Sequence, residues 1–240
     1  MIFYRIYQIF IMLPLMLVAT TLTALITIVG SMLGAGKWAG YYPPAVWSRV
    51  MCWLTFVKVT VKGRENIDPA TSYVFVANHQ GAYDIFTIYG WLGHNFRWLM
   101  KKELRKIPLV GYACEKARQV YVDNSSPARV KATMQKAEAL LKGGMSVVVF
   151  PEGARTWDGN IRPFKRGAYA LAMEFNLPVA PLTIDGAFKV MPRFAKLPRP
   201  GHITLTIHPP VMPGAEGHDL ARLMTDTRAI IASALPGEKA

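Results

Sequence analysis

The sequence predicts an α/β protein whose mainly parallel central sheet of about seven strands is flanked by helices and preceded by an N-terminal membrane-associated helical segment. Short runs of β-branched and aromatic residues recur along residues 57–207, and helical patterns separate most of them. No charged residue lies between Arg5 and Lys37, which predicts the membrane segment. We therefore expect membrane-anchoring helices over residues 1–56 and an α/β domain over residues 57–240.

The composition excludes several classes of protein. Apolar residues make up 52% of the 240 residues and charged residues 18%, so the chain has enough apolar side chains for a large core and is not intrinsically disordered. A net charge of +13 favours anionic partners, such as phospholipid surfaces, nucleic acid or phosphate-bearing substrates. We expect no nucleic acid partner, because the sequence lacks a helix-turn-helix, zinc or aromatic-basic platform pattern.

The cysteines and histidines suggest no metal site. Cys52 and Cys114 leave no room for a disulfide framework, and the five scattered histidines form no pair on one helix face. We expect no metal, no bound cofactor and a reducing compartment.

The apolar stretch over residues 9–29 matches the roughly 20 residues needed to cross a bilayer. A signal peptide cleaved near residues 34–36 is the alternative, although the stretch exceeds the usual length of about 7–15 residues. Pro14 leaves open a segment that enters one leaflet and returns. Basic residues that follow the stretch place the α/β domain on the cytoplasmic face of the inner membrane; they are Lys37, Arg49, Lys58, Lys62 and Arg64.

A second, short helix rich in tryptophan is expected from Val46 to Leu54, after a break at residues 41–44 that contains two prolines. Its tryptophans fit either the headgroup layer of a membrane or an ordinary core, and the sequence leaves both open.

Seven segments have the pattern of strands. Residues 57–62 alternate with period two and predict a half-buried, possibly edge strand, whereas residues 73–77 are continuously apolar and predict a strand buried on both faces. The other strands are expected at residues 97–100, 119–122, 146–150, 178–184 and 203–207. Helices are expected at residues 83–92, 108–116, 127–141, 168–175 and 219–235, with a short turn near Leu104.

The first candidate site follows the strand at residues 73–77. Across the turn into the next helix, Asp84 can bind one imidazole nitrogen of His79 and leave the other free to accept a proton. No Ser, Cys or Thr lies within this motif, which favours direct deprotonation of a substrate hydroxyl. The alternative is a surface histidine in a loop where Asp84 merely caps the helix.

The second candidate site follows the strand at residues 146–150. Glu152, Gly153 and Arg155 stand in the turn, and Lys165 with Arg166 adds positive charge that suits a phosphorylated substrate. Lys101, after the third strand, raises the same possibility. The alternative for all of them is a turn with solvated basic residues.

Taken together, these motifs resemble those of the glycerolipid acyltransferases typified by 1-acyl-sn-glycerol-3-phosphate acyltransferase. Asn78-His79 with Asp84 resembles the His-x4-Asp block of that family, and Phe150-Pro151-Glu152-Gly153 with Arg155 resembles its third block. Lys101 to Leu104 with Pro108 and Gly111 resembles the second block, and Val179 to Pro181 the fourth.

The resemblance implies transfer of a fatty acyl group from acyl-CoA or acyl-carrier protein to the hydroxyl of a lysophospholipid at the membrane. His79 would be the general base and Asp84 its orienting partner. The residues implied to bind substrate are Lys101, Glu152, Gly153, Arg155 and Lys165.

The sequence departs from the family pattern in the second block. Arg118 stands where that block has glycine, and Asn124 stands where it has an arginine associated with the phosphate of the acceptor. The resemblance makes lysophosphatidate the first expectation for the acceptor. Asn124 favours the alternative, a lysolipid without a phosphomonoester, such as a lyso-amino-acid lipid. A non-catalytic protein that binds anionic lipid is a remote third.

Overall fold

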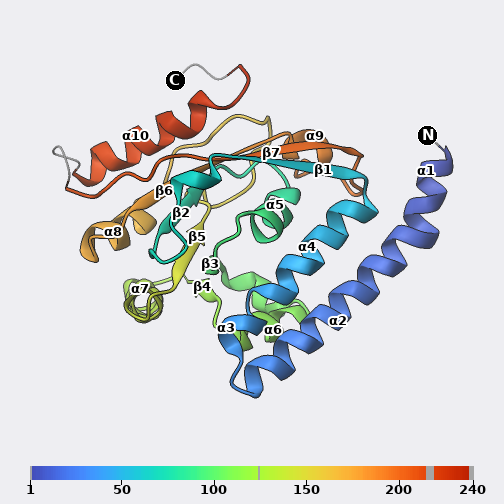
Figure 1. Cartoon of the computed structure of the whole chain (residues 1–240), viewed down its shortest axis with the longest axis horizontal. Helices are drawn as coiled ribbons and strands as arrows, with labels where there is room; N and C mark the ends of the chain where they lie inside the picture. The colour runs from blue at the N-terminus through green and yellow to red at the C-terminus, as the bar shows by residue number, and fades with distance from the viewer. Residues whose placement is uncertain (1, 124, 215–218, 238–240) are drawn as a thin grey trace.

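The computed structural model describes residues 2–123, 125–214 and 219–237, and these contain one sheet of seven strands (Figure 1). The strand order is β1-β7-β6-β2-β5-β3-β4. The strands are β1 (Val57–Lys62), β2 (Val74–Ala77), β3 (Phe96–Lys101), β4 (Val120–Val122), β5 (Ser146–Val149), β6 (Val179–Asp185) and β7 (Gly201–Ile207).

Five neighbouring strands run parallel, and β7 reverses the direction. The strands β6, β2, β5, β3 and β4 are mutually parallel, whereas β7 pairs antiparallel with β6 and parallel with β1. The mainly parallel sheet is thus confirmed, with β1 at its edge. The reversal has a local reason, since residues 186–200 contain only the one-turn helix α9 (Ala187–Val190) and no crossover helix that could return the chain for a parallel strand.

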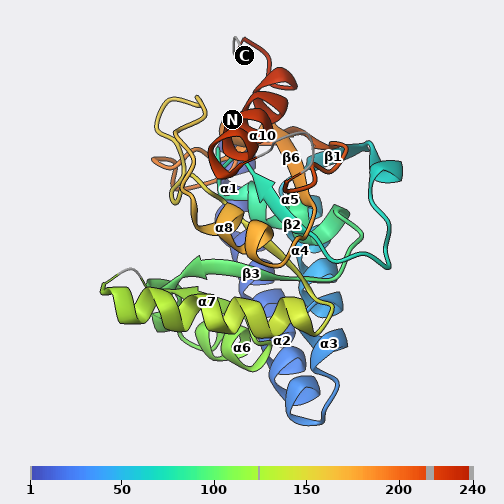
Figure 2. The same cartoon turned by 90° about the vertical axis from the view of Figure 1, so that its left-hand side faces the viewer.

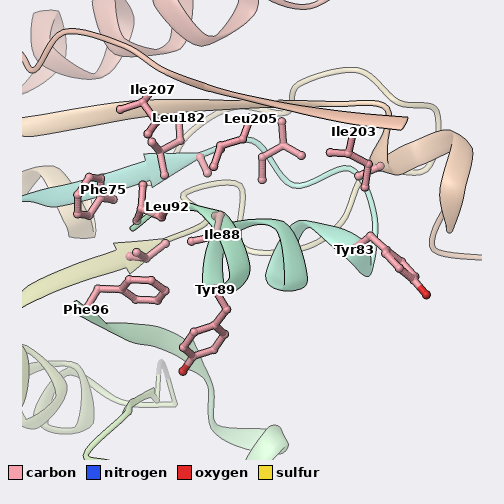
Figure 3. Close-up of a cluster of buried hydrophobic side chains, with 14 of the residues drawn as sticks. Phe75, Tyr83, Ile88, Tyr89, Leu92, Phe96, Leu182, Ile203, Leu205 and Ile207 are labelled. Carbon is pink, nitrogen blue, oxygen red and sulfur yellow. The ribbon is translucent and has the colours of Figure 1, made fainter. Parts of the chain in front are cut away.

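Helices cover both faces of the sheet. Successive side chains of β2 point to opposite faces, so Phe75 packs with α5 (Tyr83–Trp91) in one core and Val74 packs with α8 (Gly167–Glu174) and α10 (Leu220–Ser233) in the other. Figure 3 shows the first core, where Phe75, Ile88 and Leu92 lie together between strands and α5. Figure 2 shows α7 (Pro127–Lys142), α8 and α10 on the side facing the viewer.

The expected short turn near Leu104 is present, and one further short turn was not predicted. A 3-10 turn at Lys102–Lys106 (η3) leads into α6 (Val110–Lys116), and a second 3-10 turn, η2 (Arg64–Asn66), follows β1. The hydroxyl of Ser126 accepts a hydrogen bond from the backbone N–H of Arg129, so this serine is the N-cap of α7.

The N-terminal segment forms a helical hairpin. It comprises α1 (Ile2–Tyr7), a π-helical turn η1 (Gln8–Met12), α2 (Leu13–Met32), α3 (Gly36–Ala39) and α4 (Tyr42–Leu54). The expected break is present but shorter, at residues 40–41, and the second helix begins at Tyr42 instead of Val46. Both prolines lie in the first turn of α4, where the missing N–H groups have no helical acceptor. The hairpin packs on α5 and α6, and the division into two domains stays a prediction.

The segment Ile2–Met32 is long and apolar enough to cross a membrane, and most of its side chains are exposed. One side of α2 packs on α4 and α6, while the opposite side exposes large apolar side chains; they include Leu17, Val18, Leu22, Leu25 and Val29. Trp53 of α4 is 75% exposed, which excludes it from the core. These exposed side chains indicate association with a membrane.

Candidate active site

The carboxyl end of β2 carries a histidine held by a buried carboxylate. Nδ1 of His79 lies 2.7 Å from Oδ2 of Asp84, and the same oxygen accepts a hydrogen bond from the backbone N–H of Gly81 at 2.8 Å. Asp84, in the first turn of α5, is fully buried, whereas the His79 side chain is 14% exposed. With the Nδ1 proton donated to Asp84, Nε2 is the ring atom available to accept a proton from a bound hydroxyl.

The loop between β2 and α5 is fixed by its neighbours. The side-chain amide of Asn78 accepts from the backbone N–H of Ile184 at 2.7 Å and donates to its carbonyl at 2.8 Å. An ideal Cβ on Gly81 would lie only 2.5 Å from the carbonyl oxygen of Ala187 and 2.9 Å from that of Met191. Glycine is therefore required where the α9 turn packs against the loop.

Glu152 lies behind the histidine. Its Oε1 accepts a hydrogen bond from the backbone N–H of His79 at 2.7 Å, and its Oε2 accepts one from the backbone N–H of Arg162 at 2.9 Å. Burial raises the pKa of Glu152 to about 7, although the two hydrogen bonds act in the opposite direction. Both oxygens are engaged by the backbone, so this geometry suits a positioning role better than the expected contact with substrate.

Aromatic rings from two further segments support the histidine. The ring of Phe150 stacks on that of His79 with centroids 3.9 Å apart and planes within 8°, and the ring of Trp98 in β3 stacks on Phe150 at 5.3 Å. Sequence reasoning missed this row of rings. The sequence signal for this row is Phe150, an aromatic residue at the carboxyl end of a strand.

The basic candidates lie at the same edge of the sheet. Arg155 is half-buried, and Lys165 lies over Gly153, where an ideal Cβ on the glycine would come within 2.7 Å of the lysine Nζ. Lys101 is exposed at the carboxyl end of β3, two strands away from β2 and hence about 10 Å across the sheet. Gly153 and Lys165 thus lie together after β5, the strand next to β2, whereas Lys101 ends the strand beyond it.

The two departures in the second block have different outcomes. Arg118 is exposed and has a φ of +58°, so the position where the family has glycine keeps the left-handed backbone that glycine favours. Asn124 lies outside the described residues. In the described part of the chain no group of three or more His, Cys, Asp or Glu side chains is arranged to hold a metal ion.

An apolar cavity lies between the N-terminal hairpin and the α/β domain. Its lining comes from α2, α4, α5 and α6 and includes Ala24, Trp47, Tyr89 and Ala113. A second, polar cavity beside the His79 loop is lined by Gln80, Asp158 and Asp185, among others.

Comparison with known proteins agrees with this arrangement. The family described as Acyltransferase matches residues 58–185. The chain is 34% identical over 158 residues to the chloroplastic 1-acyl-sn-glycerol-3-phosphate acyltransferase BAT2 of Brassica napus, covering 65% of this chain and 46% of that protein. It is 32% identical over 176 residues to a 1-acyl-sn-glycerol-3-phosphate acyltransferase of Pseudomonas aeruginosa, covering 71% of this chain and 67% of that one.

A solved structure extends the similarity to the N-terminal hairpin. The crystal structure of the 1-acyl-sn-glycerophosphate (LPA) acyltransferase PlsC from Thermotoga maritima matches with a TM-score of 0.75 and 27% identity, covering 90% of this chain and 92% of that one. The chain spans about half the length of relatives from Brassica napus, Arabidopsis thaliana and Chlamydomonas reinhardtii. The family match covers more than half of the chain and includes both the His79–Asp84 pair and the Glu152 loop, and the chain therefore belongs to the Acyltransferase family.

Proposed function

We propose that the protein transfers a fatty acyl group from acyl-CoA or acyl-carrier protein to the free hydroxyl of lysophosphatidate, giving phosphatidate for phospholipid synthesis at a membrane. The observation that carries the proposal is the 2.7 Å contact between His79 and the fully buried Asp84. The names of the relatives, from plants, bacteria and mouse, support the same reaction.

The geometry supports a direct transfer. Nε2 of His79 takes the proton of the acceptor hydroxyl as its oxygen attacks the thioester carbonyl of the donor. The tetrahedral intermediate then collapses with cleavage of the C–S bond, and the imidazolium returns the proton to the leaving thiolate. Asp84 holds the productive tautomer and stabilises the imidazolium. Thr156, the nearest hydroxyl in the third block, is buried and donates to Asp158, so it is no candidate nucleophile.

Arg155 and Lys165 are the proposed ligands of the acceptor phosphate, with Lys101 at the margin of the site. An arginine fork suits phosphate oxygens, and Lys165 contributes a point charge over Gly153. The asparagine at position 124 favours the second candidate, an acceptor without a phosphomonoester.

The N-terminal hairpin would hold this site at the lipid surface. The packing of one side of α2 on α4 and α6 favours a helix that enters the lipid beside the domain over one that crosses the bilayer alone. The basic residues that follow α2 favour the cytoplasmic face of the inner membrane.

The test is acylation by the purified full-length protein in detergent. Labelled acyl-CoA and acyl-carrier protein are each offered with lysophosphatidate and with lysolipids that lack the phosphomonoester. His79→Ala is expected to abolish turnover, whereas His202→Ala, which removes an exposed histidine from β7, is expected to leave it intact. Full turnover by His79→Ala would overturn the mechanism, and preference for another lysolipid would favour the second candidate.

A further inference from the structure

We propose that the side chains of Trp157, Lys189, Arg193, Phe194, Lys196 and Arg199 form a second lipid-contact surface, which meets the headgroups of an anionic bilayer beside the active site. We call this set the aromatic-basic surface. The inference rests on the proposed function only in assuming that the protein works at a membrane.

The composition of the segment between β6 and β7 points to an anionic partner. Residues 186–200 contain four basic side chains and no acidic one. Phe194 in this segment is 64% exposed, and Trp157 in the loop after β5 is 59% exposed. Tryptophan and other aromatic rings flanked by lysine and arginine are typical of protein surfaces at the headgroup layer of a membrane.

Contacts join the two loops into one surface. The guanidinium of Arg193 lies over the ring of Trp157 at 4.4 Å and donates a hydrogen bond to the backbone carbonyl of Arg155 at 3.4 Å. The ring of Phe194 packs edge-on against that of Phe188, with centroids 6.2 Å apart. The exposed aromatic side chains are therefore held by neighbours and do not stand on separate loops.

The surface continues into the N-terminal hairpin. The side chain of Gln8, which is fully buried, donates a hydrogen bond to the carbonyl of Pro198 at 2.7 Å. The backbone carbonyl of Phe56 accepts from the N–H of Gly201 at 3.3 Å, and the ring of Phe56, which is 60% exposed, lies 5.4 Å from that of Tyr7. Figure 1 shows α1 and α9 in the upper right part of the molecule and α7 in the lower left.

The same segment touches the catalytic loop. The carbonyl of Met191 accepts the backbone N–H of Ala82 at 3.2 Å, and Arg193 binds the backbone of Arg155. Lipid contact at Phe194 would therefore fix the distance between the headgroups and the loops that carry His79 and Arg155. An acidic carrier protein would match the charges, but the exposed rings and their continuity with the apolar hairpin favour a lipid surface.

The test is a depth measurement on the full-length protein with its two cysteines replaced, Cys52→Ala and Cys114→Ala. An environment-sensitive fluorophore is attached to Phe194→Cys and, as the control, to Gln135→Cys, an exposed position on α7. In vesicles of phosphatidylcholine and phosphatidylglycerol, the label at 194 is expected to shift to the blue and to be quenched by nitroxide lipids, while the label at 135 is not.

Charge reversal then tests the basic side chains. Lys196→Glu with Arg199→Glu is expected to reduce the quenching at 194 severalfold in phosphatidylglycerol vesicles. The matched pair Lys131→Glu with Lys136→Glu, on exposed positions of α7, makes the same change in net charge and is expected to have no effect. Water-like fluorescence at 194, or equal loss with both pairs, would overturn the proposal.

Two further measurements distinguish lipid contact from binding of a protein partner and from failure of the proposed function. A fluorescence change at 194 on adding acyl-carrier protein, with none on vesicles, would assign the surface to a protein partner and overturn lipid contact. The depth measurement needs no acyl donor and is repeated with His79→Ala. Normal quenching together with no acyltransferase activity in the unsubstituted chain would overturn the proposed function and leave the lipid-contact surface standing.

Discussion

Oε1 of Glu152 accepts a hydrogen bond from the backbone N–H of His79 at 2.7 Å, so a residue that follows β5 holds the histidine that follows β2. The backbone carbonyl of His79 accepts in turn from the N–H of Thr156 at 3.0 Å. Both backbone groups of the histidine are thus bound by the third block. Glu152 is therefore assigned a positioning role, because it is buried and each of its carboxyl oxygens binds a backbone N–H group.

Glu152→Gln is expected to lower kcat about tenfold, the equivalent of about 1.4 kcal/mol, with little change in KM for lysophosphatidate. The amide has one acceptor oxygen, so one of the two backbone N–H groups loses its partner. Steady-state kinetics measure both constants. A rise in KM at unchanged kcat would instead mean that Glu152 binds the acceptor.

The free energy of unfolding is expected to depend on the protonation of Glu152. Its pKa is about 7 in the folded protein, against 4.5 for an unperturbed carboxyl, so between these values the folded state binds more protons than the unfolded state. Stability from this group is therefore greatest below about pH 4.5 and is lost as the pH rises through 7. Denaturant unfolding across this range measures the slope.

Glu152→Gln is also the control for that measurement. The variant lacks the titrating group, so the difference in unfolding free energy between the two proteins should change between pH 4.5 and 7 and stay constant above. If the unfolding free energies of the two proteins differed by the same amount at every pH, the pKa of Glu152 would not be raised.

Gly81→Ala is expected to destabilise the protein by about 1–3 kcal/mol and to reduce turnover, because the new methyl group overlaps the carbonyl oxygens of Ala187 and Met191. Thermal unfolding in detergent measures the first effect and acylation the second. Gly36→Ala is the control, since nothing lies within 4 Å of its ideal Cβ. Equal effects of the two substitutions would argue against a tight approach at Gly81.

Arg155→Ala is expected to weaken use of a phosphate-bearing acceptor about tenfold or more, the loss of one charge-assisted contact, and to spare a neutral acceptor. Values of kcat/KM for lysophosphatidate and for a neutral lysolipid give the comparison. Arg129→Ala, which removes an exposed arginine on α7, is the matched control. Equal losses on both acceptors would count against a phosphate contact.

Local patterns accounted for most of the fold. The seven strands and the main helices lie within a few residues of their predicted positions, because each depends on side chains next to one another in the chain. The direction of β7 was not predicted, although no helix was expected between the strands at residues 178–184 and 203–207, and a parallel pair needs such a crossover. The prolines at 43 and 44 predict an interruption on their sequence alone, whereas their position in the first turn of α4 makes them compatible with the helix.

In the candidate site, too, contacts between residues close in sequence were predictable and contacts between distant residues were not. The pairing of His79 with Asp84 spans one turn and was predicted, since five residues across a strand-to-helix connection bring the two side chains together. The link from Glu152 to His79 spans 73 residues and ends on a backbone group, so side-chain identity gave no hint of it. The stacking of Phe150 on His79 likewise depends on the order of strands in the sheet.

The reversal at β7 determines where the hairpin joins the catalytic domain. Because β1 runs with β7 and against β2, its first residue lies at the edge where β2 and β5 end, and only Thr55 and Phe56 separate it from α4. Two residues thus join the apolar hairpin to the sheet, at the same edge of the sheet that carries His79. On the proposed membrane function, no flexible linker separates the hairpin from the sheet, so the depth at which the hairpin lies in lipid would also set the depth of His79.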